Sequence, residues 1–212
     1  MSAIEIRDVL GVLLAGGLAR RMGGGDKCLH RLGERTVLDL VIARVRPQVG
    51  RIVLNANGDP SRFRSYGLEV AADVVEDHPG PLAGVLTGME WAAANAPECP
   101  WVATFATDAP FLPADLVSRL AGALVEAGAE LACARSVGRA HPVFGLWPVR
   151  LRNDLRRAVT DDGVRKVDEW TGRYALVEVD FAVGGIDPFF NLNRPADFKA
   201  AERHIARMPG DA

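Results

Sequence analysis

Long apolar runs are missing from this 212-residue sequence: no stretch approaches the roughly 18 apolar residues of a membrane span. The segment from Met1 to Asp8 is charged and has no basic stretch leading into an apolar one, as a secretory signal would. Cysteine is also scarce. Cys28, Cys99 and Cys133 are odd in number and far apart, which argues against a disulfide framework and a Cys-x-x-Cys metal site. We therefore expect a cytoplasmic protein with no membrane partner.

An excess of charge of either sign is absent as well. With 25 basic and 27 acidic residues the net charge is −2, so electrostatics gives no reason to expect nucleic acid as a partner. The four histidines lack a metal-ligand spacing, and we expect no zinc. Neither a Gly-Lys followed by Ser or Thr nor a Gly-x-Gly-x-x-Gly motif is present. These absences count against a P-loop ATPase and a dinucleotide-binding dehydrogenase.

The richest stretch that is present runs from Val12 to Lys27. Apolar residues from Val9 to Ala15 predict a buried strand, which stops where Gly16 and Gly17 free the backbone to turn. The loop beyond contains three consecutive glycines and the basic residues Arg20, Arg21 and Lys27. Because glycines let backbone N–H groups converge on an anion while basic side chains supply charge, this loop predicts a polyphosphate site.

Strand and helix patterns alternate along the rest of the chain. The expected strands are Arg51–Asn55, Leu68–Ala72, Trp101–Thr107, Glu130–Ala134, Pro142–Trp147 and Ala175–Asp180. The expected helices are Thr36–Gln48, Val85–Asn95, one beginning at Pro113, Leu151–Val159, a short one opening over Gly163–Val167, and Pro195–Met208. Arg135–His141 is expected to be a polar loop within a hairpin-like excursion. This alternation predicts one α/β domain over residues 1–212, with a mostly parallel, doubly wound, Rossmann-like sheet between two helical layers.

Polar residues follow three of the predicted strands. Asn55, Asp73 and Asp108 come at strand ends, and in a right-handed doubly wound sheet they share one cleft with the glycine-rich loop. Asp108 is a candidate Mg²⁺ ligand, because Mg²⁺ is commonly held by one or two carboxylates and substrate phosphates. It is also explained as a turn cap before Pro110. Asp187 is a second metal candidate, although Asp-Pro is an ordinary start of a turn.

The glycine-rich loop resembles the signature of the molybdenum cofactor guanylyltransferases, Leu-Ala-Gly-Gly-x-x-x-Arg-Met-Gly-Gly-x-Asp-Lys. The matching residues are Leu14, Ala15, Gly16, Gly17, Arg21, Met22, Gly23, Gly24, Asp26 and Lys27. Further elements resembling the family follow in its order, at His78–Gly84, Thr107–Pro110 and Asp187–Pro195. The last departs from the family's Asn-x-Asn-Thr-Pro at Arg194.

The resemblance implies roles for these residues. Catalysis would fall to Lys27, Arg21 and Asp108, with Asp108 holding Mg²⁺. Nucleotide contacts would come from Leu14, Ala15, Gly16, Gly17, Gly24, Lys27, Asn55, Asp73, Gly80, Gly84 and Asp108. Acceptor contacts would come from Asn191 and Asn193, and the positive charges of Arg165 and Lys166 also suit an anionic pterin phosphate. Ordinary structural roles remain open for several of them: Asp73 as a strand-ending cap, Asn193 as a helix cap, and the two basic residues as a solvated helix face.

The resemblance further implies the fold of the nucleotide-diphospho-sugar transferases and an activity. GTP and Mg²⁺ would be used to attach GMP to molybdopterin, with release of pyrophosphate. The N-terminal half would bind the nucleotide and the C-terminal half mainly the acceptor, and partners would include cofactor-delivery and molybdoenzyme-chaperone proteins. Two alternatives are a cytidylyl- or sugar-phosphate nucleotidyltransferase on the same fold, and a catalytically silent nucleotide-binding regulator.

Overall fold

The computed structural model describes residues 3–16, 26–75 and 80–207. The strands are β1 Val9–Leu14, β2 Arg31–Leu32, β3 Arg35–Thr36, β4 Arg51–Asn55, β5 Glu69–Ala71, β6 Trp101–Ala106, β7 Leu131–Ser136, β8 Arg139–Pro148 and β9 Leu176–Asp180. The α-helices are α1 Val37–Val45, α2 Pro81–Asn95, α3 Leu116–Ala127, α4 Arg152–Thr160, α5 Val167–Thr171 and α6 Pro195–Ile205. Across the described ranges, every helix is too short or too polar to cross a bilayer.

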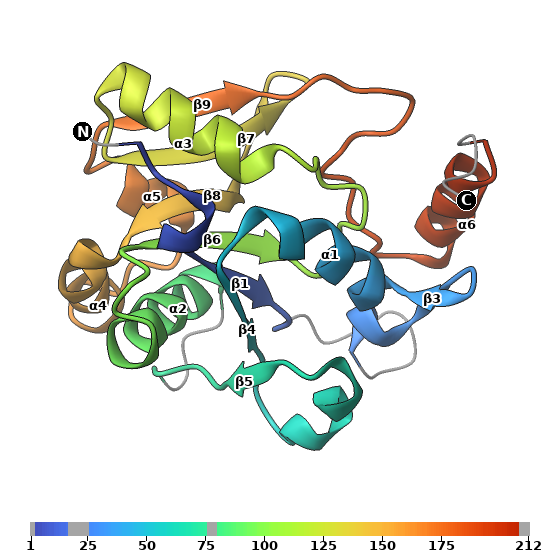
Figure 1. Cartoon of the computed structure of the whole chain (residues 1–212), viewed down its shortest axis with the longest axis horizontal. Coiled ribbons are helices and arrows are strands. Elements are labelled where there is room, and N and C mark those ends of the chain that lie inside the picture. The colour runs from blue at the N-terminus through green and yellow to red at the C-terminus, as the bar shows by residue number, and fades with distance from the viewer. Residues whose placement is uncertain (1–2, 17–25, 76–79, 208–212) are drawn as a thin grey trace.

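Seven strands form one sheet in the order β5-β4-β1-β6-β8-β7-β9 (Figure 1). All neighbours are parallel except where β8 pairs with β6 and with β7, so the mostly parallel, doubly wound sheet is confirmed. β1 lies between β4 and β6, and its last residue, Leu14, is in register with Asn55 on one side and Ala106 on the other. Three strands therefore end side by side, and the polar residues that follow them lie at one edge.

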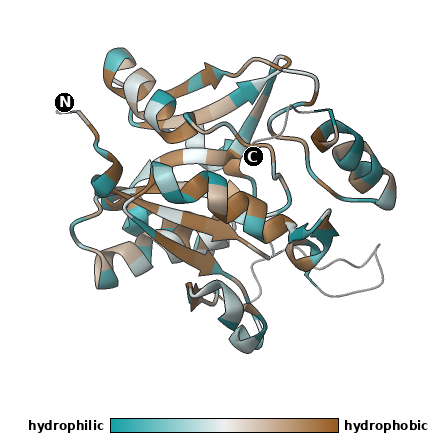
Figure 2. Cartoon of the chain, turned by 45° about the vertical axis from the view of Figure 1, so that its right-hand side comes forward, coloured by the Kyte–Doolittle hydropathy of each residue, from teal (hydrophilic) through white to brown (hydrophobic). Residues whose placement is uncertain are grey.

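Helices cover both faces of the sheet. On one face, Leu38 of α1 and Leu120 of α3 pack in a cluster with Leu13 of β1. On the other face, Leu86 of α2 and Leu155 of α4 pack with the alternate strand residue Val12 and its neighbours. Because successive side chains of a strand point to opposite faces, β1 supplies both layers of the core. Figure 2 shows the same arrangement, with hydrophobic residues concentrated on the central strands.

A third, smaller cluster holds α6 against β2 and the start of α1. Phe198 and Ala201 of α6 pack with Leu32 of β2 and with Leu192, which precedes the helix. The last helix lies to one side of the main sheet, near β3 (Figure 1). This packing brings residues 191–194, far away in the sequence, next to the segment that begins at Lys27.

Three predicted helix starts were wrong, among them that of α5, which begins at Val167 and not at Gly163. α2 begins at Pro81 instead of Val85, with Gly80 at its N-cap, because proline suits the first helical position, where no hydrogen-bonded N–H is needed. α3 begins at Leu116 instead of Pro113, with Asp115 at its N-cap. By contrast, the capping pair at the start of α1 is confirmed, since Thr36 and Asp39 bond reciprocally.

The predicted polar loop at Arg135–His141 was also wrong. β7 and β8 form a hairpin that turns through Val137 and Gly138, both with positive φ (49° and 71°). Two successive positive φ values suit the tight turns whose twist matches that of the flanking strands. Pro142 lies inside β8 instead of at its start, at the place where the register with β7 shifts, which is where a strand tolerates a proline.

Candidate active site

A lysine ammonium joins two distant segments at the carboxyl edge of the sheet. Lys27 Nζ donates to Asn193 Oδ1 at 2.6 Å and lies 3.8 Å from Asp108 Oδ2. The side chains of Lys27 and Asp108 are only 21% and 22% exposed. Residues predicted for catalysis and for the acceptor thus meet at one point, and Asn193, assigned to the acceptor by resemblance, contacts the predicted catalytic lysine.

The backbone around Asp108 is fixed from two sides. Thr107 Oγ1 donates to the carbonyl of Leu14 at 3.0 Å, continuing the β1–β6 contact beyond the strands. Leu192 N–H donates to the carbonyl of Asp108 at 2.8 Å. Burial raises the pKa of the Asp108 carboxyl, and the Lys27 charge opposes that rise. A desolvated carboxylate of this kind is stabilised by any cation placed beside it.

A neighbouring thiol is poorly suited to attack. Cys28 is buried behind Lys27 and lines a cavity of about 50 Å³ together with Leu14, Thr107 and Asp108. Burial, aided by the charge of Asp26, raises the pKa of this thiol to about 12. Since the thiolate is the nucleophilic form of cysteine, Cys28 is inert at neutral pH.

The predicted nucleoside residues contact each other directly. Asn55, which is buried, donates from Nδ2 to Asp73 Oδ1 at 2.9 Å, and Asn57 donates to Asp73 Oδ2 at 2.7 Å. Asn57 Oδ1 also accepts from the Asp73 N–H at 2.8 Å. The two amides fix the plane of the carboxylate while leaving lone pairs for a ligand.

Arg62 and Asn57 contact the predicted site residues, but the sequence patterns did not point to either of them. The Arg62 guanidinium pairs with Asp26, whose side chain is 9% exposed, and donates from Nη2 to the carbonyl of Asn57 at 2.6 Å. One arginine therefore ties the residue before Lys27 to the Asp73 cluster. Arg62 lies in an irregular segment between β4 and β5, where no periodicity points to it; the adjacent Asn55-Ala56-Asn57-Gly58 turn was the available signal for Asn57.

Gly84 lies against Asn55, one of the predicted nucleoside residues. A Cβ on Gly84 would lie 2.5 Å from Asn55 Oδ1 and 2.6 Å from Leu14 Cδ2, so a larger residue would displace both. Gly80 is exposed at the start of α2, and Ala15 and Gly16 follow β1 at the same edge. The other glycine-loop residues with predicted roles, Gly17, Arg21 and Gly24, lie outside the described residues, as do Arg20 and His78.

The predicted acceptor residues fall into two groups. Asn191 and Asn193 line a cavity of about 790 Å³ on the β7–β8 side. Arg165 and Lys166 are exposed and do not line it. The carbonyl of Arg165 lies 3.4 Å from the Cβ position of Gly80, which places this basic pair beside the start of α2.

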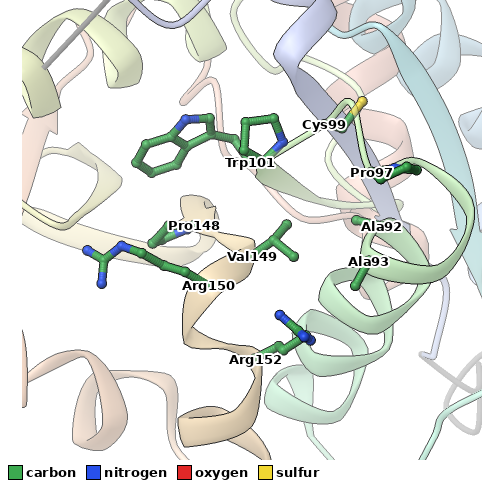
Figure 3. A pocket seen from close by; sticks show the side chains of 10 residues that line it. Ala92, Ala93, Pro97, Cys99, Trp101, Pro148, Val149, Arg150 and Arg152 are labelled. Atoms are coloured by element: carbon green, nitrogen blue, oxygen red, sulfur yellow. The ribbon is translucent and has the colours of Figure 1, made fainter.

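A third cavity, of about 430 Å³, opens at the opposite edge of the sheet (Figure 3). Its walls come from the end of α2, the start of β6 and the end of β8, and include Trp101, Val149 and Arg152. None of the predicted site residues lines this cavity. The carboxyl edge is therefore where the predicted chemistry gathers.

A mostly parallel α/β sheet with a lysine and an aspartate at its carboxyl edge, in a chain whose sequence is rich in glycine after the first strand, is typical of nucleotidyltransferases. Residues 11–176 match the family model of the MobA-like NTP transferase domain, and the chain belongs to this family. A molybdenum cofactor guanylyltransferase from Nitrobacter hamburgensis is 54% identical over 207 residues, which are 98% of this chain and 99% of that relative.

Solved structures confirm the fold. Molybdopterin-guanine dinucleotide biosynthesis protein A from Archaeoglobus fulgidus has a TM-score of 0.73 at 20% identity and covers 94% of this chain and 100% of its own. Rv0371C from Mycobacterium tuberculosis, solved in complex with manganese, has a TM-score of 0.63 at 21% identity and covers 92% and 98%. The predicted resemblance and fold class are both confirmed.

Proposed function

We propose that this nucleotidyltransferase transfers GMP from GTP to the terminal phosphate of molybdenum-loaded molybdopterin, forming the guanine dinucleotide cofactor and releasing pyrophosphate. The observation that carries this proposal is the Lys27 ammonium between Asp108 and Asn193, at the junction of the nucleotide and acceptor elements. The substrates follow from relatives that share about half of the sequence over nearly the whole chain. The chain would act as one domain over residues 1–212, in the cytoplasm, without nucleic acid.

The mechanism rests on positioning and charge. GTP lies along the glycine-rich loop with its nucleoside beside Asn55 and Asp73, and the acceptor phosphate enters from the cavity lined by Asn193. An acceptor oxygen attacks the α-phosphorus in line with the departing pyrophosphate, whose developing charge Lys27 neutralises. Because the attacking phosphate is already ionised, no general base is required, and the inert Cys28 thiol is in keeping with direct transfer.

The same centre suits Mg²⁺. The Asp108 carboxylate and the Asn193 amide oxygen both face the Lys27 ammonium, so two oxygen donors of the kind Mg²⁺ prefers already surround a positive charge. We propose that Asp108 holds the ion together with phosphate oxygens of GTP, and that Asn193 adds a second oxygen. The ion would supply Lewis-acid stabilisation of phosphoryl charge. The related structure solved with manganese supports divalent-metal use in this fold.

The decisive experiment offers the protein Mg²⁺, molybdenum-loaded molybdopterin and one nucleoside triphosphate at a time. With GTP we expect guanosine joined to the pterin by mass spectrometry, and stoichiometric pyrophosphate. A product with CTP and none with GTP would refute the guanylyl assignment and favour a cytidylyltransferase.

The Asp108→Asn variant separates an enzyme from a silent nucleotide binder. It keeps the side chain's shape but removes the charge that holds the metal, so we expect transfer to fall roughly 10²- to 10³-fold. Full transfer by this variant at low Mg²⁺ would contradict the metal assignment. Binding of GTP by the wild-type protein without any transfer to active acceptor would favour the regulator.

A further inference from the structure

Three polar side chains in the acceptor-side cavity form a hydrogen-bonded chain. Ser136 Oγ lies 2.7 Å from His141 Nε2 and 2.9 Å from both carboxylate oxygens of Asp187. Ser136 and His141 come from the two strands of the β7–β8 hairpin, whereas Asp187 comes from the segment before α6. All three line the cavity of about 790 Å³ that also holds Asn193.

The protons in this chain run toward the carboxylate. Burial lowers the pKa of His141, so the imidazole is neutral near pH 7. Because the carboxylate can only accept, Ser136 donates to Asp187, and its oxygen then accepts from His141 Nε2–H. The N–H of Phe189 also donates to Asp187 Oδ1 at 2.8 Å. Asp187 is thereby fixed in orientation, with lone pairs left over.

Asp187 has no cationic partner in the described part of the chain. No Lys, Arg or His nitrogen is within 4.0 Å of its carboxylate there, although Arg139 and Arg194 line the same cavity. Apolar surface is available beside it from the half-buried Phe190 and from Val137, which is 79% exposed at the hairpin turn. The cavity therefore combines a fixed acceptor of two hydrogen bonds with walls suited to a flat ring.

We propose that Asp187 recognises the 2-amino-4-oxopyrimidine edge of the acceptor's pterin, held in place by Ser136 and His141. The ring N–H and the amino group of that edge form parallel donors, which match a carboxylate in two-point geometry. A phosphate at the same place would meet like charge. The acceptor is thus oriented with its heterocycle at Asp187 and its phosphate at Asn193. This inference rests on the proposed function for the identity of the acceptor.

The test compares two pteridines that differ at one position. Pterin carries the amino group, and lumazine carries an oxygen in its place, which a carboxylate repels. Binding is measured by saturation-transfer NMR on the protein without GTP, so the result does not depend on guanylyl transfer. We expect the wild-type protein to prefer pterin by roughly tenfold or more, the discrimination expected of a two-point pair.

Asp187→Asn should abolish or reverse that preference, because an amide can donate to the lumazine oxygen. Asp73→Asn is the matched control: it makes the same chemical change in the other half and should leave the preference intact. Ser136→Ala should reduce the preference, since the carboxylate loses its fixed donor. A wild-type protein that binds both pteridines equally, or an Asp187→Asn variant that keeps the preference, would overturn the proposal.

Kinetics of the complete enzyme then separate recognition from folding. Asp187→Asn should raise KM for molybdopterin roughly tenfold, while KM for GTP stays unchanged. An equal rise in both KM values, or a fall in kcat alone, would contradict recognition of the pterin by Asp187. Failure of transfer in the wild-type protein, with pterin preference intact, would refute the proposed function and leave the pterin site standing.

Discussion

Two carboxylates, one in each half of the sheet, are held in different ways. Asp73 is gripped by the amides of Asn55 and Asn57 at the end of parallel strands. The Asp187 carboxylate accepts a hydrogen bond from the hydroxyl of Ser136, which is also hydrogen-bonded to the imidazole of His141. Ser136 and His141 lie on the antiparallel β7–β8 hairpin, where the strand register shifts. In the parallel half, which is formed by β5, β4, β1 and β6, the predicted site residues follow directly from strand ends. In the antiparallel half, which is built on the β7–β8 hairpin, the hairpin must first pack against the long segment before α6 to form a site.

The proposed reaction centre draws residues from both halves. Lys27 and Asp108 extend from the parallel half, and Asn193 reaches them from the segment anchored by α6. Substitutions should therefore separate into three kinds: the centre controls kcat, the parallel half controls nucleotide binding, and the antiparallel half controls acceptor binding and support.

The largest effect is expected from Lys27→Met, which removes the charge shared by the two halves. Loss of one preorganised group facing developing charge typically costs 10²- to 10³-fold, so we expect kcat to fall by roughly 10³. The measurement is initial pyrophosphate release at saturating GTP and Mg²⁺. Lys199→Met, an exposed lysine on α6, removes the same charge and should leave kcat near wild type. A Lys27→Met variant as active as this control would show that Lys27 is not part of the reaction centre.

An intermediate effect is expected from Gly84→Ala, confined to the nucleotide half. The added Cβ would meet Asn55 Oδ1 at 2.5 Å and push it from Asp73, so we expect KM for GTP to rise roughly tenfold, as for loss of a positioned hydrogen-bonding group. KM for molybdopterin should not change. The readout is a pair of KM values from crossed titrations of the two substrates.

Gly88→Ala is the matched control one helical turn further along α2. Its Cβ would meet Val12 Cγ2 at 2.5 Å, in the core and away from Asn55. We expect Gly88→Ala to lower stability about as much as Gly84→Ala does, by about 1–3 kcal/mol for overpacking, while KM for GTP stays unchanged. If both variants raised that KM equally, general destabilisation would explain the result, and the nucleotide half would lose its distinct role.

Sequence patterns predicted the parallel half well, because its strands and helix caps are determined by residues close together in the sequence. Alternation of apolar strands with capped helices fixed the sheet type, and the end of each strand located Asn55 and Asp108. The start of α1 followed from the Thr36–Asp39 pair alone. Residues at the ends of parallel strands must lie at one edge, so the placement of Asn55 and Asp108 at that edge followed from connectivity.

The antiparallel half could not be predicted to the same depth. Val137 adopts a positive φ that a β-branched residue rarely takes, so the sequence pattern favours a loop over a tight turn here. The links from Ser136 to Asp187 and from Lys27 to Asn193 span 51 and 166 residues, and no periodicity reports contacts at that range. The catalytic assignments by resemblance stay predictions, to be decided by the variants above.

The smallest effect is expected from Asp154→Asn, which probes support within the antiparallel half. Asp154 on α4 accepts from Tyr174 Oη, from Trp170 Nε1 at 3.1 Å and from Arg157 Nη2 at 3.3 Å, joining α4 to the α5 region. The Tyr174 hydroxyl is the main cause that lowers the pKa of Asp154, aided by the Trp170 and Arg157 donors. Both kinetic constants should stay at wild-type values, and only stability should change.

The sign of the pH dependence follows from that lowered pKa. The folded protein holds the Asp154 proton less tightly than the unfolded chain, so the stabilisation is fully present above the unfolded value of about 3.9 and is lost as pH falls through the lower folded value. In urea unfolding we expect Asp154→Asn to cost about 1–2 kcal/mol at pH 7, as for weakened hydrogen bonds to a charged group. The gap between variant and wild type should then shrink steadily below about pH 4, as the wild-type carboxylate takes up its proton. A gap that stayed constant down to pH 2 would mean that packing, instead of the carboxylate charge, joins α4 to the rest of this half.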